Sequence, residues 1–165
     1  MHRLSTERLP VEDATLDRII AKNVMVYVDD PLETFREFRR ILKPGGKAHA
    51  IDSDVAMVAI DPLPPQDWRD LLDAAGHAFR TPNIGHKLDG LAHAGGFSSV
   101  DVNIMAAADT TGRLLNLAQN IAGYAREVCT FDEARIQQII DTEHAALEVG
   151  TYFAVSSILV VIATV

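Results

Sequence analysis

The chain has 165 residues, the length of one globular domain, so we expect a single domain over 1–165. Hydrophobic residues make up 48% and charged residues 23% of the sequence, which excludes a disordered chain or a collagen. The formal net charge is −8, and the one basic run, over 36–47, lies mainly along a single predicted helix. Because affinity for nucleic acid depends mainly on neutralising phosphates, we expect no DNA or RNA partner.

The cysteine content and the hydrophobic segments indicate the cellular compartment. Cys129 is the only cysteine, so neither an intrachain disulfide nor a cysteine-based zinc site can form. The first residues contain no hydrophobic signal region. The uncharged stretch 151–165 is shorter than the roughly 20 residues of a membrane-spanning helix, and its many β-branched residues favour a buried strand. We expect a cytoplasmic protein with no membrane partner.

Hydrophobic periodicity predicts strands alternating with helices. In chain order these are a strand over 17–21, a helix over 31–43 ended by Pro44-Gly45-Gly46, a strand over 47–52, a helix from Pro65 to Phe79, a short helix over 88–91, a strand over 97–106, helices over 114–128 and 131–148, and a terminal strand after Gly150. Capping-box spacings at Asp30/Glu33 and at Thr130/Glu133 mark two of the helix starts. This order favours an open, largely parallel α/β sheet with helices on both faces.

Few motifs in the sequence carry chemistry. It contains no dinucleotide fingerprint, P-loop or nucleophile elbow. His86 and His93 are seven residues apart, whereas metal-binding helices use spacings of three or four, so we predict no metal site. Asp52 and Asp54 follow a predicted strand, where open α/β sheets place ligands, although capping a turn is the commoner role of such an aspartate. A metal hydrolase that uses these two carboxylates and a histidine is a minor alternative.

Three segments in the first third of the chain form a specific pattern. Residues 9–20 read LPVEDATLDRII, residues 23–31 read NVMVYVDDP, and residues 38–47 read FRRILKPGGK. This pattern resembles the second half of class I S-adenosylmethionine (SAM)-dependent methyltransferases of the type 11 group. The stretches Gly85-His86-Lys87-Leu88 and Ala94-Gly95-Gly96-Phe97 look like the segments that precede the sixth strand of that family.

The resemblance implies a Rossmann-like methyltransferase sheet, truncated to about four strands that correspond to family strands four to seven. It also implies SAM as cofactor and a small-molecule methyl acceptor. Leu9 and Val11 would close over the adenine ring. On the same basis we expect Ser5, Thr6, Lys22 and Asn23 near the cofactor, and Tyr27 and Asp54 near the acceptor. Apolar and aromatic side chains would suit an apolar acceptor, namely Met57, Trp68, Phe131, Tyr152 and Phe153.

The sequence also departs from the family pattern. It lacks the glycine-rich loop after the first family strand and the acidic residue that ends the second, so this chain alone would hold an incomplete SAM site. The strand over 17–21 would then be an exposed apolar edge. We expect a homodimer through this edge, or a partner chain that supplies the missing half. The alternative to an enzyme is a non-catalytic, truncated methyltransferase-fold module, acting as a dimer or as a subunit of a complex.

Overall fold

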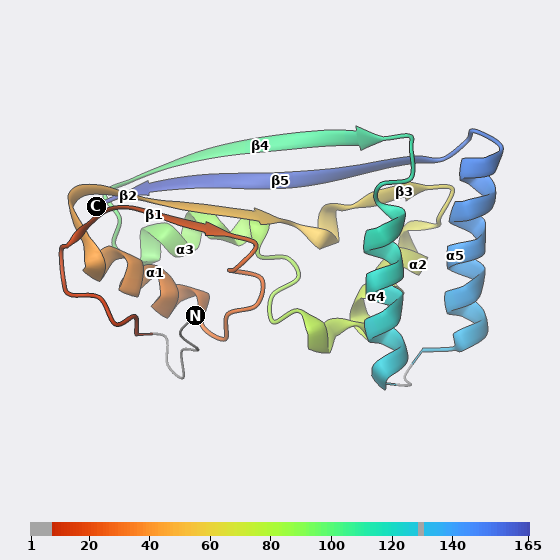
Figure 1. Ribbon diagram of the computed structural model, residues 1–165, viewed down its shortest axis with the longest axis horizontal. Helices are drawn as coiled ribbons and strands as arrows, with labels where there is room; N and C mark the ends of the chain where they lie inside the picture. Colours follow the sequence, from red (N-terminus) through yellow and green to blue (C-terminus); the bar gives the residue numbers. More distant parts are fainter. Residues whose placement is uncertain (1–7, 129–130) are drawn as a thin grey trace. The chain divides into compact units, whose positions relative to one another are not determined.

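The computed structural model describes residues 8–128 and 131–165, with the side chain of residue 128 left out (Figure 1). Ser5, Thr6, Cys129 and Thr130 therefore lie outside the described residues. The chain forms two compact units. The first unit comprises the residues up to Ser53, Asn83–Met105 and Ile158–Val165, and the second comprises Asp54–Pro82 and Ala106–Ser157.

The described residues form five strands and five α-helices, in the order β-α-β-β-α-α-β-α-α-β. They are β1 (Leu16–Lys22), α1 (Pro31–Ile41), β2 (Leu42–Ser53), β3 (Ala59–Asp61), α2 (Pro65–Ala74), α3 (Leu88–Ala94), β4 (Ser99–Asp109), α4 (Leu115–Val128), α5 (Glu133–Glu148) and β5 (Phe153–Thr164). The predicted order is confirmed, and the short β3 is an additional strand. The strand order is β1-β2-β5-β3, with β4 also paired to β5, which confirms a mixed α/β fold and gives it five strands.

Strand direction differs from the expectation. β1 runs parallel to β2, with Ile19 opposite Ala48 and Ala21 opposite Ala50. β5 runs antiparallel both to β2 and to β3. The prediction of a largely parallel sheet is therefore wrong for these pairings, because alternating strands and helices indicate an α/β fold but do not fix the direction of a terminal strand.

One face of the sheet in the first unit is buried beneath helices. α1 packs against α3, and both lie on the same side of β1 and β2 (Figure 1). Phe35 of α1 is fully buried and makes edge-to-face contacts with Phe38 and Phe97. The helices of this unit thus cover one face of these strands, whereas the sequence predicted helices on both faces of the sheet. On the opposite face Ile20 is 71% exposed.

α1 begins as the sequence predicts and ends earlier. Asp30 is its N-cap and accepts a hydrogen bond from the Glu33 backbone N–H at 3.0 Å, with Pro31 in the first turn. The helix ends at Ile41, and residues 44–46 lie inside β2 instead of forming a separate turn. Gly45 has a φ of +77°, which a residue without Cβ adopts at little cost, so the strand can bend at this point.

The second unit is built from α2, α4, α5, β3 and the beginning of β5. α4 packs against both α2 and α5. α2 ends at Ala74, so the predicted extension of this helix to Phe79 is wrong, and a 3-10 turn over Gly76–Ala78 follows instead. Asp132 caps α5 by accepting from the Ala134 backbone N–H at 3.1 Å, so the helix begins at Glu133, two residues later than the predicted start at 131. Within the described ranges no helix is long and apolar enough to cross a membrane.

Candidate functional site

The turn that follows β1 lies where two parallel strands end together. Lys22 is in register with Ile51 of β2, and the Asn23 backbone N–H donates to the Ile51 carbonyl at 2.8 Å. Asn23 has a φ of +54°, a left-handed conformation that asparagine tolerates better than most residues. The chain therefore leaves β1 abruptly at the carboxyl edge of the sheet, which is where open α/β sheets hold their ligands.

The side chain of Asp52, near the end of β2, holds this turn by hydrogen bonds. Its side chain is 1% exposed, and its Oδ2 accepts a hydrogen bond from the Met25 backbone N–H at 3.1 Å. Burial raises the pKa of the Asp52 carboxyl, and hydrogen bonds from the backbone amides of Met25, Val24 and Val26 oppose this shift. The carboxyl thus accepts hydrogen bonds from three consecutive backbone amides and fixes the loop that carries Asn23 and Tyr27.

Three of the predicted site residues lie on or beside this turn. Lys22 and Asn23 are exposed, and the Tyr27 side chain is 53% exposed. The Tyr27 backbone N–H donates to the Val24 carbonyl at 3.0 Å, so the ring follows directly from the anchored loop. The structure therefore brings Lys22, Asn23 and Tyr27 into one short segment, while their roles toward a cofactor or an acceptor remain predictions.

Asp54 belongs to the second unit and has a local structural role. Its side chain is fully buried and caps the 3-10 turn Val55–Met57 by accepting from the Ala56 backbone N–H at 3.2 Å. This is the capping role that the sequence left open beside the functional one. Contact of Asp54 with an acceptor stays a prediction.

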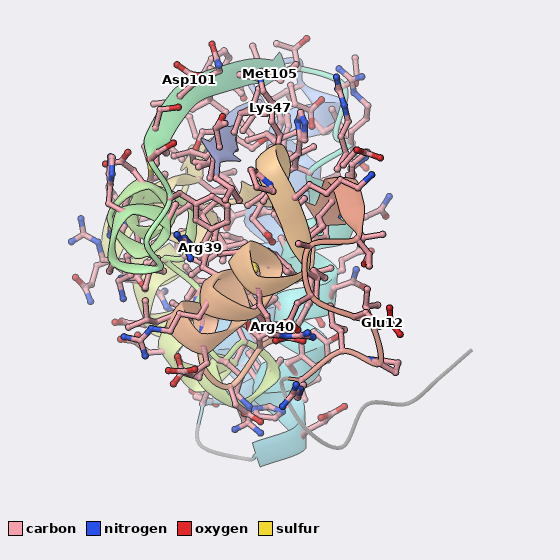
Figure 2. The ribbon with its side chains drawn as sticks, turned by 90° about the vertical axis from the view of Figure 1, so that its left-hand side faces the viewer. Glu12, Arg39, Arg40, Lys47, Asp101 and Met105 are labelled. Atoms are coloured by element: carbon pink, nitrogen blue, oxygen red, sulfur yellow. The ribbon has the colours of Figure 1, made fainter. Side chains whose placement is uncertain are left out.

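The segment that carries the family-like Leu9-Pro10 pair is tied to α1. The Leu9 backbone N–H donates to Glu37 Oε1 at 2.7 Å, and Arg40 Nη2 donates to the Val11 carbonyl at 2.9 Å. Arg40 also forms ion pairs with Glu37 and Asp13. Figure 2 shows Arg40 extending from α1 toward the segment that carries Glu12. Hydrogen bonding to Arg40 lowers the pKa of Glu37, so the pair stays charged at neutral pH.

The sequence did not predict the roles of three residues that organise this region, Asp52, Glu37 and Arg40. Asp52 was identified only as one of two carboxylates after a strand, and its role as an anchor depends on a turn 27 residues earlier in the chain. Glu37 and Arg40 are three apart on a helix, a spacing typical of a local ion pair. That spacing could have flagged the pair, but not the loop that the pair holds.

An apolar cavity of about 440 Å³ lies within the second unit. Met57, Trp68 and Phe153, which the sequence grouped as apolar candidates, all line it, whereas Phe131 and Tyr152 do not. Tyr152 is 3% exposed. In the part of the chain that the structure describes, no group of three or more His, Cys, Asp or Glu side chains could hold a metal ion.

Comparisons with known proteins agree with the fold. The family model described as a methyltransferase domain matches residues 1–50. No curated protein matches the chain. A Bacillus halodurans protein assigned as a methyltransferase is 11% identical with a TM-score of 0.59, and the alignment covers 96% of this chain and 73% of that protein. The YcgJ protein of Bacillus subtilis is 14% identical with a TM-score of 0.57, covering 96% and 67% respectively.

A SAM-dependent methyltransferase of Thermotoga maritima is 16% identical with a TM-score of 0.50, and the alignment covers 96% of this chain and 60% of that protein. At these identities the similarity concerns the fold. The chain spans between 60% and 73% of the length of these three proteins. The family model covers only residues 1–50, so what the comparisons show for the whole chain is a fold shared with methyltransferases.

Proposed function

We propose that this chain is part of a SAM-dependent methyltransferase that acts on a small molecule. The family match and the shared fold support methyl transfer in general. The observation that carries the proposal is the turn Asn23–Tyr27, which Asp52 fixes at the carboxyl edge of two parallel strands. An anchored loop at this edge can position an acceptor against a methyl donor, and positioning supplies much of the rate of such a displacement.

We propose that Lys22 and Asn23 contact SAM at this edge of the sheet. Bound SAM would supply an activated methyl group on its sulfonium. The exposed Lys22 ammonium can pair with a carboxylate, and the Asn23 amide can both donate and accept hydrogen bonds. The Asp52 carboxyl is engaged by backbone amides and is therefore occupied. Because the sequence contains no glycine-rich phosphate or cofactor loop, we propose that this chain holds only part of a SAM site.

Isothermal titration calorimetry with SAM tests the cofactor proposal. We expect weak heat, with a Kd near the millimolar range, that the substitution Asn23→Gly removes. Glycine keeps the positive φ of this position, so only the side chain is lost. Ala14→Gly is the matched control, because Ala14 has a φ of +53° and no polar side chain.

The calorimetric outcomes separate the two functions. Micromolar binding would contradict the incomplete site and support a self-sufficient enzyme. Absence of heat at millimolar SAM would contradict the roles of Lys22 and Asn23 and support the non-catalytic module instead. Loss of binding in both glycine variants would show that the effect comes from the backbone and would also contradict the role of the Asn23 side chain.

One observation favours the module as a second candidate. β1 lies at the end of the strand order, pairs with β2 on one side, and has no strand on its other side among the described residues. Ile20 of this strand is 71% exposed. Unpaired backbone groups on an edge strand favour pairing with another chain. We propose that β1 pairs with a second copy of the chain or with a separate chain that carries further strands.

Size-exclusion chromatography with light scattering at low micromolar concentration tests self-association. We expect a dimer that Ile20→Lys dissociates, because a lysine on an edge strand opposes strand pairing. Ile104→Lys is the matched control, since Ile104 is 61% exposed on β4. A monomeric wild-type chain, or a dimer that survives Ile20→Lys, would contradict pairing of β1 with a second copy.

A further inference from the structure

The apolar cavity of the second unit has the size of a ligand site. Its volume is about 440 Å³, within the roughly 300–1,000 Å³ of small-molecule pockets. Its wall comes from the 3-10 turn Val55–Met57, from β3, from the first turns of α2 and from Phe153 at the start of β5. Four separate segments of one compact unit therefore converge on the cavity.

The side chains that face the cavity are large and apolar. Met57 is 47% exposed and Phe153 is 45% exposed, although such residues are usually buried. Trp68 is 3% exposed, and its Nε1–H donates to the Val55 carbonyl at 3.0 Å. Because the only polar group of the indole is already bonded, Trp68 offers the cavity an apolar ring surface.

Two charged side chains also line the cavity, and they have opposite signs. Asp61 lies at the end of β3 and Arg69 lies in α2, and both are exposed. Neither has an ion-pair partner among residues 8–128 and 131–165. The Asp61 carboxylate would repel an anionic ligand, and the Arg69 guanidinium would repel a cationic ligand. The two charges together favour an occupant without net charge.

We propose that this cavity binds an uncharged, mostly apolar small molecule. The bound molecule would cover the exposed surface of Met57 and Phe153, and removing this apolar surface from water would stabilise the complex. The test of this site uses neither SAM nor a methyl acceptor, so this proposal and the proposed methyl transfer can fail separately.

Trp68 is the only tryptophan of the chain, so its emission reports on this cavity alone. The probe is N-phenyl-1-naphthylamine, which is uncharged and absorbs where tryptophan emits. We expect saturable energy transfer from Trp68 to the probe with one probe per chain. In the Trp68→Phe variant the transfer is lost, while direct excitation of the probe still gives a saturable titration.

A cavity-filling substitution tests the location. Ala59 of β3 lines the cavity, and Ala59→Phe should weaken probe binding about tenfold or more. Ala107→Phe is the matched control, because Ala107 is an exposed β-strand alanine of the same unit that does not line the cavity. Its affinity should equal that of the wild type. Far-UV circular dichroism and thermal unfolding establish that all variants are folded.

The charge argument has its own probe. The anionic 1-anilinonaphthalene-8-sulfonate carries the same ring system plus a sulfonate, and we expect it to bind more weakly than the neutral probe. Tighter binding of the anion would overturn the neutral occupant. Non-saturable binding, or equal affinity in Ala59→Phe and the wild type, would overturn the site itself. Probe affinity that falls as the chain concentration rises would show that a second copy covers the cavity, which also overturns the proposal.

Discussion

Two buried carboxyls, one in each unit, have opposite hydrogen-bonding environments. Asp52 in the first unit is 1% exposed and accepts hydrogen bonds from backbone amides of the turn after β1. Glu143 in the second unit is fully buried on α5, and neither of its carboxyl oxygens has a hydrogen-bond partner among the described residues. Burial raises the pKa of both groups, and that of Glu143 rises to about 7.

A second buried polar group of the second unit, the hydroxyl of Tyr152, also lacks a hydrogen-bond partner among the described residues. Burial, together with the carboxylates of Asp109 and Glu143, raises the pKa of Tyr152 to about 12. Asp109 itself is satisfied, since it accepts from the Leu114 backbone N–H at 2.7 Å. A carboxyl with donors organises a loop, whereas a carboxyl without donors lowers stability once it ionises.

The largest expected effect concerns the pH dependence of stability through Glu143. Its folded-state pKa of about 7 exceeds its ordinary value of 4.5. The unfolded chain therefore loses this proton first, and stability falls as pH rises from about 4.5 to 7, by about 3 kcal/mol. Urea unfolding across this range should show that Glu143→Gln removes this component. Glu148→Gln, at an exposed position of α5, is the control and should retain it. Equal pH profiles for wild type and Glu143→Gln would contradict the raised pKa.

The next effect concerns the anchored turn. Asp52→Ala removes the acceptor of the turn amides and should lower the free energy of unfolding by about 2 kcal/mol. Asp52→Asn keeps an oxygen that can accept these bonds and should cost less. Hydrogen exchange at Val24, Met25 and Val26 should accelerate in the alanine variant and much less in the asparagine variant. Unchanged exchange at these amides in Asp52→Ala would show that the carboxyl does not hold the turn.

The smallest expected effect concerns Arg40, whose ion pair with Glu37 is only partly buried. Arg40→Ala removes the bonds from α1 to the Val11 carbonyl and to Asp13, leaves the Leu9–Glu37 bond, and should lower the free energy of unfolding by about 1 kcal/mol. Arg36→Ala breaks the exposed Arg36–Glu33 pair on the same helix and should cost less than about 0.5 kcal/mol. Chemical unfolding of both variants measures the difference. Equal costs would mean that Arg40 contributes nothing through the segment it contacts.

Local signals in the sequence predicted much of the fold. The cap at Asp30 and the apolar spacing that includes Phe35 and Phe38 located α1, and the β-branched run located β5. Strand direction and β3 escaped prediction because both depend on pairing with β5, which lies about 100 residues later in the chain. A three-residue strand also has no periodicity to detect.

The candidate site was predictable only in part, for the same reason. Lys22, Asn23 and Tyr27 are close in sequence, so placing the end of one strand placed all three. Asp52 and Arg40 act on segments about 27 residues away, and no local pattern encodes such contacts. The lack of a hydrogen-bond partner for Glu143 depends on the side chains packed around it in the folded unit. In the sequence, a glutamate within an amphipathic helix looks like an ordinary surface residue.

The division into two units constrains how the chain can be cut. The chain passes between the units at 53/54, 82/83, 105/106 and 157/158, and two of these passages lie inside β4 and β5. No terminal truncation can therefore yield either unit as one continuous polypeptide. Any cut at 105/106 or 157/158 would interrupt a strand. Isolated units would have to be made by joining separated segments with designed linkers, and proteolytic trimming from either end would remove parts of the first unit before it reaches the second.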